Sequence, residues 1–531
     1  MPAPSETPPA ASRGQRSHAD GTLSVLFDQP RPLDTAEGTP APDFFVDLNL
    51  DQLVAAITAQ WEQYNLKPFF HSPLRRVEAI RYRHDVFRDL EDTTLLGAIR
   101  GFTKAMRDVR VLSNLSSKLH DRFHKEMWFV HAIEIYCEAV QRFAGDLAGS
   151  RLKSRGLLAF REYLARYIES ADFIALRDEA KAIVATLSEI KYSILIREGS
   201  FTVQNFHDEA DYSAEVEATF EKFKQGAVND YLAKFTNAPE DINHIEAKVL
   251  EFVARLNPKP FSRLLNYCSR HTDFLDKAIA TFNREIQFYV SYLDQIAKLE
   301  PAGLKFCLPE VSDSKRHIRC QDGFDIMLAI KLTGAGKPVV CNSFDLSGKE
   351  RVIVVSGPNQ GGKTTFARMF GQLHYLASLG CPVPGRQARL FLFDQLFTHF
   401  EREEKVENLR GKLEDDLVRI KSILDRATPR SIIVLNEIFT STTIQDETFL
   451  SQKVMEKIMD LGVLGIWVTF VDELATFGPQ TVSMVSTVVP DQPALRTFKI
   501  ERRRADGLAY AMAIAQKYGL TYERIKERVS A

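Results

Sequence analysis

Apolar residues recur at helical spacing through most of the first 300 residues of the chain. Between about Asp43 and Glu300 they stand three or four positions apart, which is the period of one face of an amphipathic helix. The clearest run falls between Phe261 and Leu299, where alternating steps of four and three residues join Leu275, Ile279, Phe282, Ile286, Tyr289, Leu293 and Ile296. This spacing predicts one helix with a coiled-coil-like seam, roughly 55 to 60 Å long at a rise of 1.5 Å per residue. The pattern fits a lever or strut, and it fits equally a long core helix without a mechanical role.

A β-hairpin is predicted among these helices, between about residues 192 and 206. Two short runs rich in β-branched and aromatic residues, Tyr192 to Arg197 and Phe201 to Phe206, flank the turn residues Glu198, Gly199 and Ser200. The acidic run that follows would repel phosphate groups. It contains Asp208, Glu209, Asp211, Glu215 and Glu217.

After about Phe306 the pattern changes to short apolar runs separated by helical stretches. The runs lie at Val352 to Val355, Ile432 to Leu435, Leu464 to Thr469 and Val485 to Val489. Continuous apolar runs of this length are typical of a largely parallel sheet buried on both faces. The fold class is therefore multidomain, with a mostly α-helical core or lever domain at residues 43–305 and an α/β domain at residues 306–531.

The first 42 residues are predicted to form a flexible tail. They hold eight of the 23 prolines of the chain together with many Ser, Thr, Ala and Gly residues, a composition that buries too little apolar surface to offset the entropy of ordering. We interpret the short apolar piece from Leu23 to Phe27 as a less polar part of this tail.

Composition narrows the function classes. A net charge of −2 and a pI near 6.7 exclude a globally basic nucleic-acid binder, so any DNA contact must come from a local patch. The cysteines are scattered without C-x-x-C pairs, which argues against a zinc site and a disulfide framework and favours a reducing, cytoplasmic compartment. No apolar run approaches the roughly 18 to 20 residues of a membrane span, and the amino terminus lacks a signal-peptide segment.

A phosphate-binding loop is predicted directly behind the run that ends at Val355. The sequence from Gly357 to Thr364 has the spacing G-x-x-x-x-G-K-T, and a helix from Thr365 to Ser378 would direct the positive end of its dipole at the phosphates. Glycines let backbone N–H groups surround a triphosphate, Lys363 reaches the outer phosphates and the Thr364 hydroxyl coordinates Mg²⁺. The predicted ATP-binding residues are Gly357, Pro358, Asn359, Gly361, Gly362, Lys363, Thr364 and Thr365.

The pieces that follow this loop resemble, in order, the ATPase domain of the MutS mismatch-repair family. Residues 377–384 are similar to its G-x-x-V-P-A turn, residues 396–399 to its IFTR segment and residues 440–443 to its G-T-S-T loop. The strand from Ile432 to Glu437 resembles Walker B, and Pro73 to Ile80 resembles the opening of the helical core domain. The resemblance covers about Leu48 to the carboxyl end in outline and is specific from about Val352 to Leu474. It implies a P-loop ATPase of the ABC-like type at residues 306–531.

Walker B departs from the family pattern. The expected Asp-Glu stands as Asn436-Glu437, so the resemblance implies that Glu437 acts with Lys363 in catalysis while the metal side retains Thr364 and Asn436. An Asn still hydrogen-bonds metal-bound water but brings no negative charge, so we expect weaker Mg²⁺ binding and slow hydrolysis. Equally, Asn436 could be a strand-end polar residue with Mg²⁺ held by Thr364 and the phosphates alone.

Three other positions depart from the family. The family's A-T-H has become Val468-Thr469-Phe470, which removes a phosphate-sensing histidine. The segment that a partner subunit would offer across a dimer reads Leu409 to Asp416, where Gly411 is small enough to approach a phosphate and the alternating charges also fit a solvated helix face. Before the loop strand, Val340 takes the place of an aromatic residue that would stack on adenine, with less stacking energy.

The sequence offers little for mismatch readout. Phe160-Arg161-Glu162 matches the family's Phe-x-Glu wedge by letter only, because it falls inside a predicted helix. Short basic patches could face DNA, although each is also an ordinary solvated surface. These patches are Arg75 and Arg76 with Arg81 and Arg83; Arg151 with Lys153 and Arg155; and Arg502 to Arg504.

Two functional hypotheses of different classes follow. The leading one is an ATP-binding, slowly hydrolysing, DNA-associated MutS-like switch in DNA repair or recombination, without mismatch readout of its own. It would work with Mg²⁺ as a homodimer through its ATPase domain, on double-stranded or branched DNA and away from membranes. The alternative is a dimeric nucleotide-binding scaffold that organises protein partners and has lost DNA binding.

Overall fold

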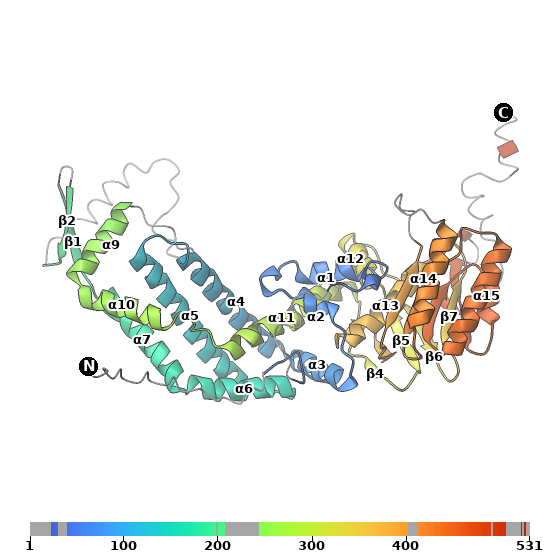
Figure 1. The fold of residues 1–531 in the computed structure, drawn as a ribbon, viewed down its shortest axis with the longest axis horizontal. Helices are drawn as coiled ribbons and strands as arrows, with labels where there is room; N and C mark the ends of the chain where they lie inside the picture. Colours follow the sequence, from blue (N-terminus) through green and yellow to red (C-terminus); the bar gives the residue numbers. More distant parts are fainter. Residues whose placement is uncertain are drawn as a thin grey trace, which may run out of the picture.

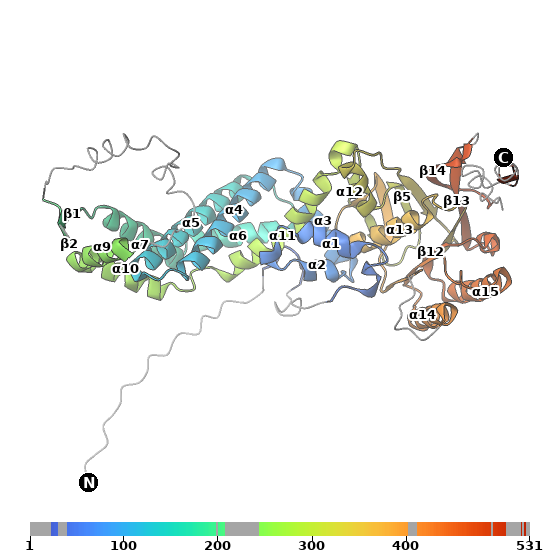
Figure 2. The same cartoon turned by 90° about the horizontal axis from the view of Figure 1, so that it is seen from above.

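The computed structural model describes residues 23–29, 40–197, 200–207, 244–401, 411–489, 492–505, 522 and 525–526. The described chain is elongated and curved, with helices at one end and an α/β part at the other (Figures 1 and 2). The predicted acidic run after the hairpin, Leu409, Arg410 and most of the predicted tail lie outside the described residues.

Helices make up most of the chain up to Ala302. Near the α/β part lie the short η2 (Asp43–Phe45), α1 (Leu50–Thr58), η3 (Glu62–Tyr64), α2 (Lys67–His71) and α3 (Val77–Asp89). The helical arm continues with α4 (Thr93–Ser116), α5 (Arg122–Gly149), α6 (Arg155–Ile168), α7 (Ala171–Ser188), α9 (His244–Leu256), α10 (Pro258–Arg270), α11 (Lys277–Ala297) and η4 (Glu300–Ala302). Side-chain caps fix several starts: Asp92, Asp121 and Ser170 each accept a hydrogen bond from a backbone N–H in the first turn of the helix that follows.

The prediction of one helix through the 261–299 region is wrong. Helix α10 ends at Arg270 and α11 begins at Lys277. Asp276 has an extended backbone and its side chain accepts a hydrogen bond from the N–H of Ile279, so it caps a new helix. Phe274, in the turn, is buried against Phe129 and Tyr136. Capping and aromatic burial therefore outweigh the heptad seam, which survives only within α11.

The predicted β-hairpin is confirmed. Strands β1 (Tyr192–Arg197) and β2 (Ser200–Asn205) pair antiparallel at the end of the arm that is farthest from the α/β part (Figure 1). The Phe201 ring packs edge to face on Phe252 of α9. Tyr192, Ile194 and Leu195 remain exposed.

A six-stranded sheet forms the centre of the α/β part, in the order β10-β11-β12-β7-β13-β14. Neighbouring strands are parallel except β13 and β14, which confirms the largely parallel sheet. The strands are β7 (Val352–Ser356), β10 (Leu396–Phe400), β11 (Ile432–Asn436), β12 (Leu464–Val468), β13 (Thr481–Val489) and β14 (Gln492–Arg502), and η5 (Asp472–Thr476) lies between β12 and β13.

Both faces of this sheet are covered, which explains the continuous apolar runs. Ile353 and Val355 belong to the apolar cluster that includes α13 (Lys363–Ser378). Val352 and Val354 point the other way and belong to the cluster of α14 (Lys412–Arg426) and α15 (Ile444–Leu461). Alternate residues of one strand thus serve two cores.

A smaller sheet, which the sequence did not reveal, adjoins the first. Its order is β4-β9-β5-β6, and a separate two-stranded pair joins β3 to β8. The strands are β3 (Phe306–Cys307), β4 (Glu310–Ser312), β5 (Ile318–Gly323), β6 (Asn342–Leu346), β8 (Val383–Pro384) and β9 (Gln387–Phe391), with α12 (Ile326–Gly334) between β5 and β6. Most of these strands are too short or too polar to show a period in the sequence.

Helix α13 begins two residues earlier than predicted and is buried along most of its length. Its carboxyl end is fixed to the helical part by main-chain and tyrosine hydrogen bonds. The N–H of Leu74 donates to the carbonyl oxygen of Ser378 at 2.8 Å, and the Tyr375 hydroxyl donates to that of Phe70 at 2.7 Å. The Tyr292 hydroxyl of α11 reaches the carbonyl oxygen of Pro382 at 2.5 Å. These bonds connect the helices to the α/β part.

The interpretation of Leu23 to Phe27 as part of a flexible tail is wrong. Val25 and Leu26 are fully buried among α3, α6 and α11. In the part of the chain that the structure describes, every helix is too short or too polar to cross a lipid bilayer.

Candidate functional site

The parallel strands bring four connections to one edge of the large sheet. The carboxyl ends of β7, β12, β11 and β10 lie together there, because these strands run in the same direction. The glycine-rich loop, residues 357–364, follows β7, while Glu437 follows β11 and Phe470 follows β12. Residue 401 leaves β10, and α14 begins eleven residues farther on, at Lys412. Topology thus assembles residues that are more than 100 positions apart.

The glycine-rich loop needs its glycines because the backbone of β13 lies against it. A Cβ on Gly361 would stand 2.1 Å from Ser486 Oγ, and one on Gly357 would stand 2.9 Å from the Ser486 carbonyl oxygen. Gly357 and Gly362 also have φ values of 110° and 92°, which only glycine adopts easily. The Ser486 hydroxyl donates to the carbonyl oxygen of Gly361 at 2.8 Å. Ser486 therefore holds the loop, a role that no local pattern indicated.

Helix α13 starts at the loop itself, with Gly362 as its N-cap. The first N–H groups of a helix lack partners within it, and the helix dipole makes this end favourable for an anion. Thr364, the next predicted ligand residue, is half-buried in the first turn. Backbone donors and dipole converge on one place, as phosphate binding requires.

Lys363 is buried and held inside the loop. Its Nζ donates to the carbonyl oxygens of Gly357 at 3.0 Å and Pro358 at 3.2 Å, and it stands 3.8 Å from Glu437 Oε1. The centroid of the Phe470 ring lies 4.4 Å from Nζ. Burial lowers the pKa of Lys363, and the Glu437 carboxylate opposes that shift. A phosphate could replace the neutral carbonyl oxygens as partners of the ammonium, while Glu437 is its charged partner.

Phe470 contacts the site in a way the sequence analysis missed. It stands where the resemblance places a histidine, and a phenyl ring neither donates to phosphate nor acts as a base. Its face instead stabilises the Lys363 ammonium by a cation–π contact. Where the resemblance implies a phosphate-sensing histidine, this chain therefore has a ring that contacts Lys363.

Asn436 ends β11 with a buried acceptor. No described group hydrogen-bonds to its Oδ1, and the residue is almost fully buried. Glu437 follows with φ of 51°, held by a bond of 2.9 Å from its N–H to the Val468 carbonyl oxygen. A buried acceptor without a protein partner fits a water molecule or a metal-bound water. The pair Asn436 and Thr364 is thus chemically suited to Mg²⁺, an oxygen-seeking ion.

A buried hydrogen bond between His399 and Asp416 links α14 to β10, and Asp416 also contacts the loop behind Walker B. His399 Nε2 stands 2.9 Å from Asp416 Oδ1, and Asp416 Oδ2 accepts a bond of 3.3 Å from the Phe439 N–H. Burial alone would raise the pKa of Asp416, but the His399 hydrogen bond and charge, the Phe439 N–H and Arg419 together outweigh burial, and the pKa falls. At Asp416 the solvated-face alternative is therefore wrong. We noted His399 only as part of a motif, because burial of its partner is invisible in sequence.

Gly411 caps α14 at a distance from the glycine-rich loop. A Cβ there would meet no atom within 4 Å. Helix α14 follows β10, which is three strands from β7, so roughly 14 Å of sheet separates the two strands at 4.8 Å per strand. Within one chain Gly411 does not join the loop. Its neighbour Lys412 forms an ion pair with Glu401.

An aromatic residue does approach the loop, from β14 rather than from the segment before β7. Phe498 lies 3.8 Å from the position of a Cβ on Gly362 and has φ of 58°. Its carbonyl oxygen accepts from Asn342 Nδ2 at 3.1 Å. Val340 lines an adjacent hollow of about 330 Å³, together with Cys341, Lys499 and other residues. The strand that supplies Phe498 follows the loop by more than 130 residues, so no local signal identified it.

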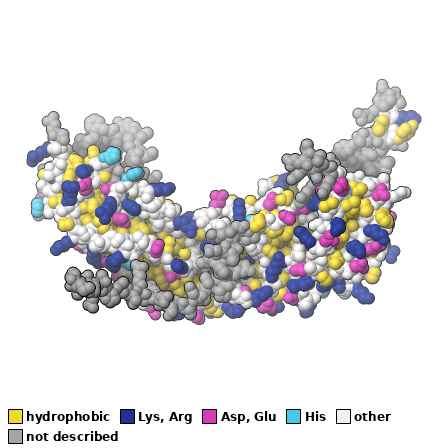
Figure 3. Space-filling model, viewed as in Figure 1, with side chains coloured by type: hydrophobic (Ala, Val, Ile, Leu, Met, Phe, Trp, Pro, Cys, Tyr) yellow, Lys and Arg dark blue, Asp and Glu magenta, His cyan; other side chains and the backbone are white. Residues whose placement is uncertain are grey.

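The arginines of the predicted basic patches differ in their burial and in their partners. Arg83 is buried and does not face a partner. Arg76 pairs with Asp28 and Arg75 donates to the Asp394 carbonyl oxygen, while Arg81 is exposed, so DNA contact by the rest of the first patch stays a prediction. Arg155 lies over the Tyr82 ring, and Arg502 pairs with Glu350. In Figure 3, Lys and Arg side chains alternate with Asp and Glu over the visible described surface.

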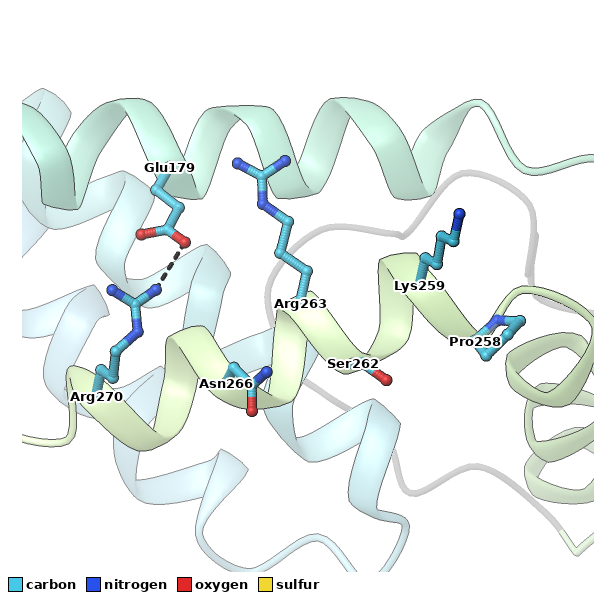
Figure 4. A pocket seen from close by; sticks show the side chains of 7 residues that line it. All are labelled: Glu179, Pro258, Lys259, Ser262, Arg263, Asn266 and Arg270. Atoms are coloured by element: carbon cyan, nitrogen blue, oxygen red, sulfur yellow. Dashed lines mark hydrogen bonds and ion pairs between the residues drawn. The ribbon is translucent and has the colours of Figure 1, made fainter.

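A different basic cluster lines an open hollow of about 580 Å³ between α10 and α7. Figure 4 shows Lys259, Arg263 and Arg270 on one side of α10, pointing toward α7. Arg270 pairs with Glu179 at 2.7 Å. Lys259 and Arg263 have no hydrogen bond or ion pair with other described residues. Their charges are available to an anionic partner.

Comparison with known proteins agrees with this geometry. Residues 353–527 match the family model described as MutS domain V. The chain is 25% identical over 313 residues to the DNA mismatch repair protein MutS of Granulibacter bethesdensis, which is 56% of this chain. It is 30% identical over 192 residues, 35% of this chain, to Endonuclease MutS2 of Thermus thermophilus. The DNA mismatch repair protein msh3 of Aspergillus oryzae is 26% identical over 268 residues, 46% of this chain.

The match covers only part of each relative. It spans 32% of the Granulibacter protein, 25% of the Thermus protein and 24% of the Aspergillus protein. The similarity therefore concerns the α/β part and some of the helices before it, and the activities named for those proteins are not carried over by the comparison itself.

Proposed function

The chain belongs to the MutS family, and from that premise we propose that it is an ATP-binding, slowly hydrolysing switch whose helical core and lever domain (residues 43–305) responds to an ATPase domain (residues 306–531). One observation carries the proposal. Lys363 lies buried in a glycine-rich loop at the start of α13, where its ammonium donates to carbonyl oxygens of the loop and forms an ion pair with Glu437 at 3.8 Å. This is the arrangement that binds and polarises a triphosphate.

We assign a separate role in ATP binding and hydrolysis to each part of the site. Backbone N–H groups of the glycine-rich loop and the Lys363 ammonium bind the phosphates, and the dipole of α13 adds to their field. Thr364 and Asn436 supply oxygen atoms for Mg²⁺, which would neutralise phosphate charge. Glu437 orients or deprotonates the attacking water. Because Asn436 lacks a carboxylate charge, we propose weak metal binding and slow turnover.

For the base, we propose that adenine stacks on Phe498 beside the hollow lined by Val340. Phe498 is 48% exposed as a residue and its side chain lies next to Gly362, so an aromatic side chain is accessible near the loop. Stacking on an aromatic ring contributes more than contact with Val340 alone.

We further propose that the complete site needs a second copy of the chain. Gly411 has open space around it and is three strands from β7, so it cannot cover its own loop. In a dimer, the start of α14 from one subunit would close the loop of the other. Sedimentation in ATP tests this, because Gly411→Glu would place a negative charge toward the γ-phosphate and disfavour an ATP-dependent dimer. An unaltered dimer in that variant would contradict the composite site.

The basic hollow on α10 favours an anionic partner such as DNA, in keeping with a role in repair or recombination. The burial of Arg83 and the pairing of Arg76 with Asp28 reduce the positive charge that this patch offers to DNA, which favours the alternative, a nucleotide-binding scaffold for proteins. Retention on a DNA column separates the two, since phosphate contacts give a steep loss of binding with added salt. Substitution of Lys259 and Arg263 by Glu should then abolish retention if α10 is the contact.

The central prediction concerns Lys363→Ala. Removal of the ammonium deletes a charge-assisted contact, so ATP affinity should fall about tenfold to a hundredfold while the fold persists. Titration of a fluorescent ATP analogue measures this, and Lys349→Ala, an exposed lysine before β7, is the control. A folded Lys363→Ala protein with the parent affinity would contradict the proposed site.

A second prediction isolates the base contact. Phe498→Ala should weaken ATP about tenfold through lost stacking but leave inorganic tripolyphosphate binding unchanged, because the phosphate cradle is intact. Leu495→Ala is the matched control, since both side chains are 48% exposed on β14. Equal losses for ATP and tripolyphosphate would show that Phe498 supports the loop rather than the base.

A third prediction separates the two Walker B residues. Asn436→Asp should tighten Mg²⁺ and raise turnover, whereas Glu437→Gln should suppress turnover without abolishing ATP binding. Steady-state ATPase assays across a Mg²⁺ titration, paired with ATP binding, report both effects. The roles assigned here are wrong if Glu437→Gln hydrolyses ATP at the parent rate.

A further inference from the structure

A short amino-terminal segment is bound in a groove of the helical part through its own backbone. We call residues 23–29 the strap. The Ser24 carbonyl oxygen accepts from the Tyr82 hydroxyl, and the Val25 carbonyl oxygen accepts from the Tyr289 hydroxyl, each at 2.6 Å. The Val25 N–H donates to Glu285 Oε2 at 2.8 Å, and the Leu26 N–H donates to the same oxygen at 3.3 Å. The strap backbone is therefore hydrogen-bonded by side chains of the helices and not by the backbone of a strand or helix.

The side chains of the strap complete this binding. Ser24 Oγ donates to the Glu285 carboxylate at 2.8 Å and accepts from the Phe27 N–H at 2.9 Å, which turns the segment. Val25 and Leu26 are fully buried. The Phe27 ring packs edge to face on Phe69 at 6.2 Å.

The groove is shaped for close backbone approach. A Cβ on Gly156, near the start of α6, would stand 2.7 Å from the Tyr82 hydroxyl and 3.3 Å from Val25 Cα. Gly156 therefore leaves room for both the strap and the tyrosine that binds it. Helices α3, α6 and α11 together form the walls.

Buried Arg83 joins the strap to the end of α13. Its Nε donates to the Leu26 carbonyl oxygen at 3.1 Å, and its Nη1 donates to the Leu379 carbonyl oxygen at 2.7 Å. The guanidinium also lies over the Phe288 ring, 4.8 Å from the centroid. One cation therefore bonds both the strap and the residue that caps the helix carrying Lys363.

Glu285 depends on the strap for its partners. Among the described residues, the hydrogen bonds to its buried carboxylate all come from Ser24, Val25 and Leu26. Burial raises the pKa of Glu285, and these bonds oppose that shift. Without the strap a carboxylate and a guanidinium would lose bonds in the interior, a strongly unfavourable state unless the groove opens or refills.

We propose that the groove of α3, α6 and α11 is a peptide-binding site whose ligand is the strap, and that an occupied groove locks the helical part to the carboxyl end of α13. Its ligand class is a short turned segment with a small hydroxyl residue, two aliphatic residues and an aromatic residue in succession. The peptide site itself stands without the proposed function, whereas the effect on ATP turnover rests on it. Release of the strap would loosen the joint opposite the nucleotide.

The binding test uses the full chain with residues 23–29 replaced by a Gly/Ser sequence of equal length. A fluorescent synthetic peptide with the sequence of residues 22–30 should bind this protein and should bind the parent at least about tenfold more weakly, because the parent groove is filled. A peptide with Leu26→Asp should not bind. Equal binding to both proteins, or none to the folded replacement protein, overturns the proposal.

Two single substitutions test the proposal if the replacement protein does not fold. Val25→Ala in the full chain should speed hydrogen exchange of the amides at 378–381 by about tenfold, and the exposed-site control Val46→Ala should not. Addition of the parent peptide should restore slow exchange. Unchanged exchange in Val25→Ala would show that the strap does not lock α13.

The experiments can refute the strap proposal without refuting the proposed function, and the reverse. Peptide binding and hydrogen exchange require no nucleotide, so they should persist in a Lys363→Ala background. ATP turnover of the Val25→Ala protein should differ from that of Val46→Ala only if the lock reaches the nucleotide site. If exchange changes and turnover does not, the strap holds the joint without regulating it, which refutes the regulatory part.

Discussion

Burial of α13 with both of its ends engaged is the constraint on which the rest of the structure depends. Its amino end opens the glycine-rich loop, and its carboxyl end is bonded to α2, α3 and the segment before α3. A helix of 16 residues is about 24 Å long and, packed among neighbours at interior density, moves as a unit. A displacement of the phosphate end of α13 would therefore move its carboxyl end, where the helical arm is attached.

Two buried cations mark the ends of this helix and follow the same chemistry. Lys363 is bonded to carbonyl oxygens of the loop, and Arg83 is bonded to the Leu26 and Leu379 carbonyl oxygens. Each has a carboxylate nearby, Glu437 and Glu285 respectively. Buried charges with neutral partners are costly unless every contact is kept, so each end is sensitive to the loss or gain of one ligand. At the Lys363 end the proposed ligand is a phosphate, and at the Arg83 end it is the strap.

The packing shows which contacts are made by the residues that depart from the family pattern. Phe470 contacts the Lys363 ammonium, and Asp416 is buried against His399. The side-chain oxygen of Asn436 accepts no hydrogen bond from the described residues. The pair of His399 and Asp416 ties α14 to the loop behind Walker B, so the residues that would meet a second subunit share a hydrogen-bond chain with those beside Glu437. In such chains a shift at one member changes the geometry of the next.

The sequence by itself determined the elements whose signals are local: the strands β7, β11 and β12, the loop and α13 behind it, and the hairpin β1–β2. Periodicity and turn residues act over a few positions, so these predictions needed no knowledge of neighbours. Tertiary structure alone decided the rest. Phe498 and Ser486 contact the loop from strands more than 120 residues away in the sequence. Asp276 starts a new helix where the heptad pattern predicted a continuous one. The strap binds because distant tyrosines, Glu285 and Arg83 hydrogen-bond to its backbone. Backbone recognition and burial depend on which elements become adjacent, and that information is absent from any single stretch of the chain.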